Sequence, residues 1–278
     1  MNISKTEVEE FYQTLLEKEH SRHTAEKYRR DAMGLVVWLG GAELTKEKAL
    51  AYKQMLMENY QVRSVNSMLS SVNAFFAFLK RQDLQLKTLK LQHQTYLSKE
   101  KELTKGEYEK LVKAAKENKD ERLYYLIQTI CATGIRVSEL AAVTVESLKE
   151  RQATINCKGK VRKIIIPKDL CNALRSYAKS KDIKSGSIFI TKGGKALDRS
   201  NIWKMLKALC KKAKVAPSKV FPHNLRHLFA RTYYRLKKDI VRLADVLGHS
   251  SIDTTRIYTM ETGEIHRRQI ERLGLLQC

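Results

Sequence analysis

The chain has 278 residues and a formal net charge of +23 at pH 7, with 53 lysines and arginines against 30 aspartates and glutamates. This length suits two domains that each bury a core. The longest stretch without a charged residue, 64–79, is shorter than the roughly 20 apolar residues of a membrane-spanning helix, so no membrane span is expected. The N-terminus turns acidic where a secretion signal needs an apolar segment, which predicts a cytoplasmic location.

The positive charge is concentrated in the second part of the chain. Residues 1–100 contain 15 basic and 12 acidic residues, whereas residues 101–278 contain 38 and 18. This excess favours a polyanionic partner, and nucleic acid is the first candidate because phosphate neutralisation supplies most sequence-independent affinity. A merely soluble basic protein and a protein bound to anionic lipid are the alternatives, but no single amphipathic helix carries the excess.

The five cysteines do not indicate a disulfide framework or a zinc ribbon. Their number is odd and none are spaced as Cys-x-x-Cys. Reduced, structural thiols are the simpler interpretation.

The first hundred residues are predicted to be all-α. A capping box at Ser4 and Glu7 starts one helix, and Gly40-Gly41 ends a second that begins near Ser21. Further helices are expected after Thr45 and over residues 64–81. From residue 82 to about 101 the periodicity fades into an extended connection. We expect a helical domain at 1–95, a linker at 96–102 and a second domain at 103–278.

The second part has a mixed pattern. A capping box at Thr104 and Glu107 restarts helix, and the apolar run 123–135 is typical of a central core helix. Short β runs follow at 153–157, 161–166 and 187–190, with Lys158-Gly159-Lys160 at a hairpin tip. Helices resume from residue 198 and extend, with breaks, to residue 273. The fold class is mainly α: an N-terminal all-α domain, then a C-terminal α+β domain with a small antiparallel sheet.

Three further motifs place chemically useful residues beside turns or helix starts. They are Thr133-Gly134-Ile135-Arg136-Val137-Ser138-Glu139-Leu140, His223-Asn224-Leu225-Arg226-His227, and Leu247-Gly248-His249 with Tyr258 nine residues on. His223 and His227 have the spacing of a zinc helix, but Asn224 stands where a metalloprotease needs its glutamate. Each motif alone is also compatible with ordinary packing, a helix cap or a surface ion pair.

Together with Lys158-Gly159, these motifs resemble the tyrosine recombinases in order and spacing, over residues 101–273. The first hundred residues resemble that family's core-binding domain in length and helix pattern. The short segment after Tyr258 and the lack of any further N-terminal domain resemble the Xer branch and small mobile-element integrases.

The resemblance implies site-specific cutting and rejoining of DNA through a covalent 3′-phosphotyrosine, without metal or cofactor. Arg136 and Arg226 are expected to clamp the phosphate, since planar bidentate donors suit its oxygens, with His249 as a third donor. Tyr258 is the expected nucleophile and His223 its base. Lys158 is the expected general acid, and Lys160 is a close rival.

The resemblance also implies partners: double-stranded DNA with a specific recombination site, and a homotetramer on that DNA. We expect the final helix, 264–273, to dock on a neighbouring protomer. Three alternatives stay open: a type IB topoisomerase, a non-catalytic DNA-binding protein, and a zinc hydrolase built on His223 and His227.

Overall fold

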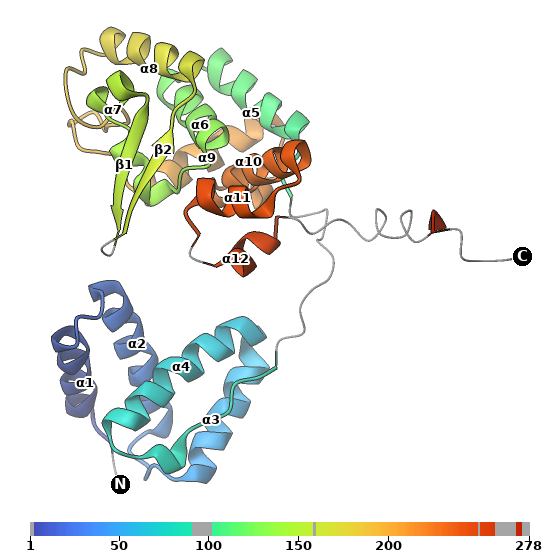
Figure 1. The fold of residues 1–278 in the computed structure, drawn as a ribbon. Coiled ribbons are helices and arrows are strands. Elements are labelled where there is room, and N and C mark those ends of the chain that lie inside the picture. Colours follow the sequence, from blue (N-terminus) through green and yellow to red (C-terminus); the bar gives the residue numbers. More distant parts are fainter. Residues whose placement is uncertain (1–2, 91–101, 158–159, 250, 259–270, 274–278) are drawn as a thin grey trace, which may run out of the picture. The chain divides into compact units, whose positions relative to one another are not determined.

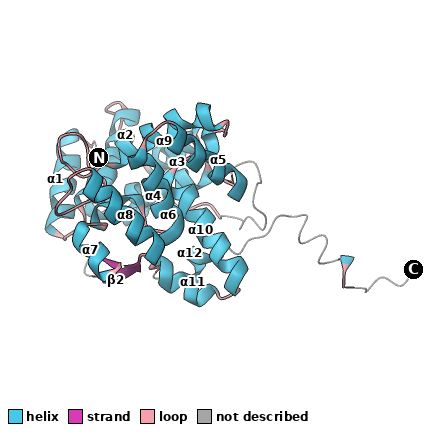
Figure 2. Ribbon diagram, turned by 90° about the horizontal axis from the view of Figure 1, so that it is seen from above, coloured by secondary structure: helices cyan, strands magenta, loops and turns pink. Residues whose placement is uncertain are grey.

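The computed structural model describes residues 3–90, 102–157, 160–249, 251–258 and 271–273. The chain divides into two compact units, Met1–His93 and Gln94–Cys278. Helices dominate the described residues of both units (Figure 2), and the second unit adds an antiparallel hairpin. The fold is mainly α, with an all-α unit followed by an α+β unit, as predicted from the sequence.

The first unit packs its helices around one apolar core (Figure 1). Side-chain oxygens of Ser4, Ser21 and Thr45 cap the helix starts that the sequence predicts, and Gly40 ends the second helix in the left-handed region. The second helix packs against the other three named here. The helices are α1 (Lys5–Glu17), α2 (Arg22–Leu39), α3 (Lys46–Asn59) and α4 (Val62–Phe78).

The described part of the segment after α4, residues 82–90, is not an extended connection, contrary to our interpretation of 82–101; residues 91–101 lie outside the described residues. A 3₁₀ turn, η1 (Gln82–Leu84), leads into a chain whose Leu84 and Leu86 are buried in the core of the first unit. Asn73 on α4 holds this chain, because its amide donates to the Leu86 carbonyl and accepts from the Leu86 N–H, both at 2.8 Å. The first unit therefore includes the described residues up to 90.

The second unit is built around α6, which packs against α5, α8 and α10. Its core includes Leu126, Ile127 and Ile130 of α6, all fully buried. The capping box at Thr104 and Glu107 is present at the start of α5. The helices of this unit are α5 (Lys105–Glu117), α6 (Glu121–Thr133), η3 (Val137–Ala142), α7 (Val145–Glu150), α8 (Lys168–Ser180), α9 (Arg199–Ala213), η4 (Pro217–Lys219), α10 (Pro222–Lys237), α11 (Ile240–Leu247) and α12 (Ile252–Arg256).

The hairpin consists of β1 (Gln152–Cys157) and β2 (Lys160–Ile165), paired from Gln152 with Ile165 to Cys157 with Lys160. The prediction of a third strand at 187–190 was wrong, because this segment makes only isolated bridges, at Ser187 and Ile190. Its consecutive residues Ile188 and Phe189 are both buried, which a half-exposed strand does not allow. The Ile188 N–H donates to the Val143 carbonyl at 3.0 Å instead of pairing with the hairpin.

Helix α8 was missed by the sequence reading. Its buried residues Cys171, Leu174, Tyr177 and Ala178 recur at three- and four-residue intervals, which is the pattern of an amphipathic helix.

Some predicted features lie outside the described residues. These are Lys158 and Gly159 at the hairpin tip, and all of the final predicted helix except 271–273. Among the described residues, no helix is long and apolar enough to cross a membrane.

We predict that Asn73→Ala destabilises the first unit by about 1–3 kcal/mol, because it leaves two buried backbone groups of Leu86 without partners. Trp38 lies in the first unit and Trp203 in the second. Urea unfolding followed by Trp38 fluorescence in a Trp203→Phe background therefore reports on the first unit. Gln54→Ala, at an exposed position of α3, is the control and should stay within about 0.5 kcal/mol. An unshifted transition for Asn73→Ala would contradict the assigned role.

Candidate active site

Arg136 is placed by the turn that ends α6. Gly134 ends the helix at φ +63°, and a Cβ there would lie 2.4 Å from the Phe229 ring, so glycine is required on both counts. The chain then turns into η3, where the Arg136 guanidinium donates to Glu139 at 2.9 Å and to the Gly248 carbonyl at 3.3 Å. The Arg136 side chain is 38% exposed, so it is held in place yet still accessible.

Arg226 projects from α10 into the interior and is only 2% exposed. One terminal nitrogen donates to the Gly134 carbonyl, and the other donates to the Leu247 carbonyl at 2.8 Å. These carbonyls close the C-terminal ends of α6 and α11, where unpaired carbonyls carry partial negative charge. Burial, followed by repulsion from Arg136, lowers the pKa of Arg226 to about 10, so it remains charged at neutral pH.

His249 lies beside Arg226, and its tautomer follows from its two contacts. Its Nε2 is 3.1 Å from an Arg226 nitrogen, which can only donate, so Nε2 accepts. The proton is then on Nδ1 and is donated to the buried Thr255 hydroxyl at 2.8 Å. Burial, together with the nearby positive charges of Arg226 and Arg136, lowers the pKa of His249 to about 4. The ring is therefore neutral at pH 7 and acts here as an acceptor.

Tyr258 follows α12 and is 3% exposed, in a small apolar cluster with Ala230, Leu243 and Leu247. Its ring is stacked near the His249 ring, with centroids 6.0 Å apart. Tyr258 is close enough to Arg226 to offset part of the lowering of the Arg226 pKa. The structure therefore brings Arg136, Arg226, His249 and Tyr258 together.

The two histidines of α10 differ in their relation to Tyr258. The His227 ring meets Tyr258 edge to face at 4.7 Å between centroids, and it also contacts His223 at 4.3 Å. Burial lowers the pKa of His227 to about 3, and its buried Nε2 has no hydrogen-bond partner within the described structure. His223 is exposed on one side, and its pKa is lowered by partial desolvation and by Arg226. Sequence reasoning gave His227 a supporting role and did not anticipate its contact with Tyr258.

Arg162 on β2 is a second residue at the site that the sequence reading missed. Its guanidinium pairs with Glu139, which also holds Arg136, and donates to the Val246 carbonyl at 3.2 Å. The sequence does contain a signal for this role. Side chains alternate along a strand, so Arg162 lies on the same, inward-facing side as Ile164 and Ile166, where a charged residue needs a partner.

The site is strongly cationic. Arg136, Arg162 and Arg226 contribute three guanidinium groups, and Glu139 pairs with Arg136 and Arg162; the pKa of Glu139 is lowered because its bonds to these two arginines outweigh its burial. Among the described residues, no group of three or more histidines, cysteines or acidic side chains could hold a metal ion. A cluster of fixed guanidinium groups beside a tyrosine hydroxyl is chemically suited to bind an oxyanion next to a nucleophile.

Comparisons with known proteins agree with this class. Residues 101–264 match the model of the phage integrase family, and residues 8–83 match the phage integrase N-terminal SAM-like domain. The tyrosine recombinase XerA of Thermococcus kodakarensis is 31% identical over 98% of this chain and 96% of its own.

Solved structures are similar over nearly the whole chain. A crystal structure of XerA recombinase is 26% identical with a TM-score of 0.54, covering 98% of this chain and 99% of that one. The Tn1549 transposon integrase, solved with transposon right end DNA, is 19% identical with a TM-score of 0.72 over 98% and 99% of the two chains. The chain belongs to the phage integrase family. It is a Xer-like tyrosine recombinase, an enzyme class that cleaves and rejoins DNA at specific sites.

We predict that the protein loses stability as the pH falls from about 6.5 to 4. In the unfolded chain histidine has a pKa of about 6.5, whereas His227 and His249 in the folded chain have pKa values of about 3 and about 4. The unfolded state therefore binds more protons than the folded state in this pH window. The contribution of these histidines to the free energy of unfolding is fully present above pH 6.5 and is lost as the pH is lowered.

Thermal unfolding between pH 4 and 7 tests this expectation. His227→Phe should make the pH dependence shallower, whereas His23→Gln, at an exposed position of α2, should not change it. If the melting temperature depends on pH equally in the wild type, His227→Phe and His23→Gln, His227 is not the source of the pH dependence.

Proposed function

We propose that the protein recombines two specific DNA sites through a covalent 3′-phosphotyrosine on Tyr258. The observation that carries this proposal is the buried Arg226, which lies beside both His249 and the Tyr258 hydroxyl. A phosphodiester placed there would meet the nucleophile and a permanently charged donor at the same point. The DNA complexes among the structural relatives support a DNA substrate.

In the proposed reaction the Tyr258 oxygen attacks phosphorus, and the bond from phosphorus to the 5′-oxygen breaks. Arg136 and Arg226 stabilise the negative charge that develops on the non-bridging oxygens. The departing 5′-oxygen takes a proton, for which Lys158 is the proposed source and Lys160 the rival. The 5′-hydroxyl of a second strand later reverses the step and releases Tyr258.

The Tyr258 proton needs an acceptor, because a tyrosine hydroxyl is protonated at neutral pH. His223 remains the proposed base, and the lowered pKa keeps it neutral and able to accept. The contact between His227 and Tyr258 makes His227 the competing candidate.

His249 must change its bonding to serve as a phosphate donor. A phosphate oxygen that takes the Arg226 donor frees Nε2 of His249, and the phosphate charge raises the pKa of the ring. His249 can then accept a proton at Nε2 and donate it as a hydrogen bond to the phosphate.

For the predicted domain at residues 1–95, which contains the first unit, we propose the role of the DNA-binding core-binding domain, with 96–102 as linker and 103–278 as catalytic domain. The match of residues 8–83 to the SAM-like domain supports it. Some cations of this unit have acidic partners within the chain, such as Arg29 with Glu9 and Arg81 with Asp83. A tetramer on two DNA sites, assembled through the C-terminal segment, and a cytoplasmic location complete the proposal.

We predict a covalent adduct between Tyr258 and DNA. A library of nicked duplexes with a randomised core is incubated with the protein, and adducts that survive SDS are recovered and sequenced to identify the preferred site. Tyr258→Phe should abolish the adduct. Tyr234→Phe on α10 is a matched loss of a hydroxyl and should retain it. An adduct with Tyr258→Phe would exclude Tyr258 as nucleophile, and relaxation of plasmids without recombinant product would favour a type IB topoisomerase.

We predict that Arg136→Lys and Arg226→Lys each lower the cleavage rate of bound DNA on the order of 10³-fold, as for other cationic groups that stabilise phosphoryl transfer. A lysine keeps the charge but loses the bidentate geometry. Single-turnover cleavage of the selected duplex at saturating protein measures this effect. Arg235→Lys, at an exposed position of α10, should cleave at the wild-type rate. Rates within about threefold of wild type for the Arg136 and Arg226 variants would remove these residues from the clamp.

A further inference from the structure

Arg162 is a charged residue of β2 whose side chain is only 17% exposed, and no step proposed above uses it. Its two terminal nitrogens bond to different segments: one to the Glu139 carboxylate and the other to the Val246 carbonyl at 3.2 Å. Its Nε is buried without a hydrogen-bond partner in the described structure. Burying a guanidinium with one nitrogen unpaired costs free energy. Such a group is expected where the fold needs a guanidinium at that place.

The Glu139 carboxylate links Arg162 to Arg136. Glu139 is 9% exposed, and its Oε1 accepts from the Arg136 guanidinium at 2.9 Å. Its Oε2 accepts from Arg162 and from the Arg136 backbone N–H, the latter at 2.9 Å. Without Arg162, one carboxylate oxygen would lose its side-chain donor, and Glu139 could rotate away from the position that holds Arg136.

Arg162 also supports the turn that carries His249. A Cβ built on Gly248 would lie 2.3 Å from Cδ of Arg162, so the arginine side chain packs closely against this glycine. Gly248 has φ +62°, and its carbonyl accepts from Arg136 at 3.3 Å. Arg162 therefore touches η3 through Glu139, α11 through Val246, and the turn just before His249.

We propose that Arg162 is a positioning residue for strand cleavage, which fixes Arg136 through Glu139 and holds the Gly248 turn at the position where phosphate binds. This inference rests on the proposed function. Arg162 lies on β2, the strand that begins at Lys160. The same residue therefore also connects the hairpin of β1 and β2 to the proposed phosphate-binding arginines.

The guanidinium shape explains why arginine is needed here. Its planar fork bonds to a carboxylate and a carbonyl in fixed directions while the side chain packs against Gly248. A lysine ammonium keeps the charge and can reach one of these acceptors at a time. Arg162→Lys should therefore restore part of what Arg162→Ala loses.

The test separates cleavage rate from DNA affinity. Arg162→Ala should lower the single-turnover cleavage rate on the order of 10²-fold, the scale expected when a catalytic group is displaced by about 1 Å. The affinity of the same protein for the selected nicked duplex should change less than about threefold. Arg162→Lys should fall between Arg162→Ala and wild type in cleavage rate.

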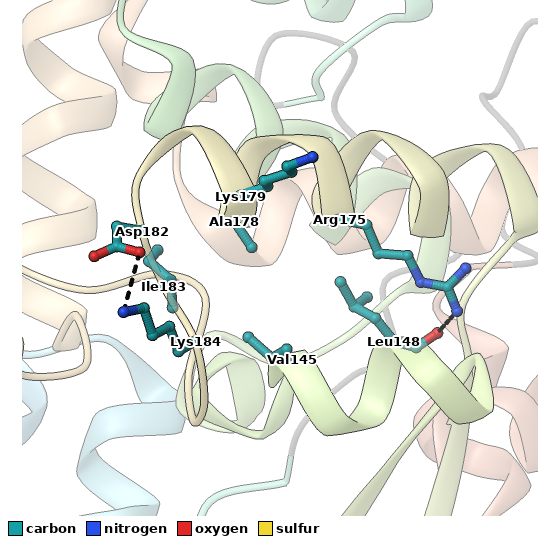
Figure 3. A pocket seen from close by; sticks show the side chains of 8 residues that line it. All are labelled: Val145, Leu148, Arg175, Ala178, Lys179, Asp182, Ile183 and Lys184. Carbon is teal, nitrogen blue, oxygen red and sulfur yellow. Dashed lines mark hydrogen bonds and ion pairs between the residues drawn. The ribbon is translucent and has the colours of Figure 1, made fainter.

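Arg175 provides a matched control (Figure 3). It is also an arginine that donates to a carbonyl, that of Leu148, but it is exposed and lines a cavity between α7 and α8. Arg175→Ala removes a guanidinium from the same unit and should leave the cleavage rate unchanged. If Arg162→Ala and Arg175→Ala lower the rate equally, Arg162 acts only through general stability, and the proposal fails.

A double-mutant cycle tests the route through Glu139. If Arg162 acts by holding Glu139, adding Arg162→Ala to Glu139→Gln should lower the rate much less than Arg162→Ala does alone. Additive effects would overturn the proposed coupling. Should Arg162→Ala fail to fold, the cycle is carried out with Arg162→Lys, to which the same two outcomes apply.

The outcomes also separate this proposal from the proposed function. Absence of a Tyr258-dependent adduct in the wild-type protein would overturn the proposed function. A Tyr258-dependent adduct that forms at the wild-type rate in folded Arg162→Ala would leave the proposed function intact and overturn the role of Arg162.

Discussion

The second unit depends on the buried guanidinium of Arg226. It donates to the carbonyls that end α6 and α11, so one side chain of α10 fixes two helix ends that are distant in the sequence. The turn after α6 carries Arg136, and the turn after α11 carries His249. A single hydrogen-bonded cation thereby sets the distance between the other charged and polar groups of the site. Burying a cation is unfavourable, but the partial negative charge of two helix ends offsets much of it.

The site also carries more positive than negative charge. Glu139 pairs with Arg136 and Arg162, and burial, followed by the positive charges of Arg226, Arg136 and Arg162, lowers the pKa of His249 to about 4. A phosphate anion is the natural complement of this arrangement, because it relieves repulsion among the arginines and allows His249 to take a proton. The same groups thus disfavour a protonated histidine in the free protein and favour it once the anion is bound.

Local signals in the sequence account for most of the fold. Ser4, Ser21, Thr45 and Thr104 begin helices because their side chains satisfy the first backbone N–H groups, and Gly40 and Gly134 end helices because they adopt positive φ. The predictions were wrong where tertiary contacts decide the local structure. Residues 187–190 look like a strand but pair with neighbouring loops, and the polar segment after α4 is held by the Asn73 side chain, which no local pattern reveals.

For the site, the sequence by itself determined the candidates, since the order and spacing of the motifs single out Arg136, Lys158, His223, Arg226, His249 and Tyr258. Only the tertiary structure decided how they act on one another. It set the acceptor state of His249, put His227 against Tyr258 and brought Arg162 to Glu139. The physical reason is that protonation and hydrogen-bond direction depend on burial and on charges from segments far apart in the chain, whereas caps and turns depend on neighbours in sequence.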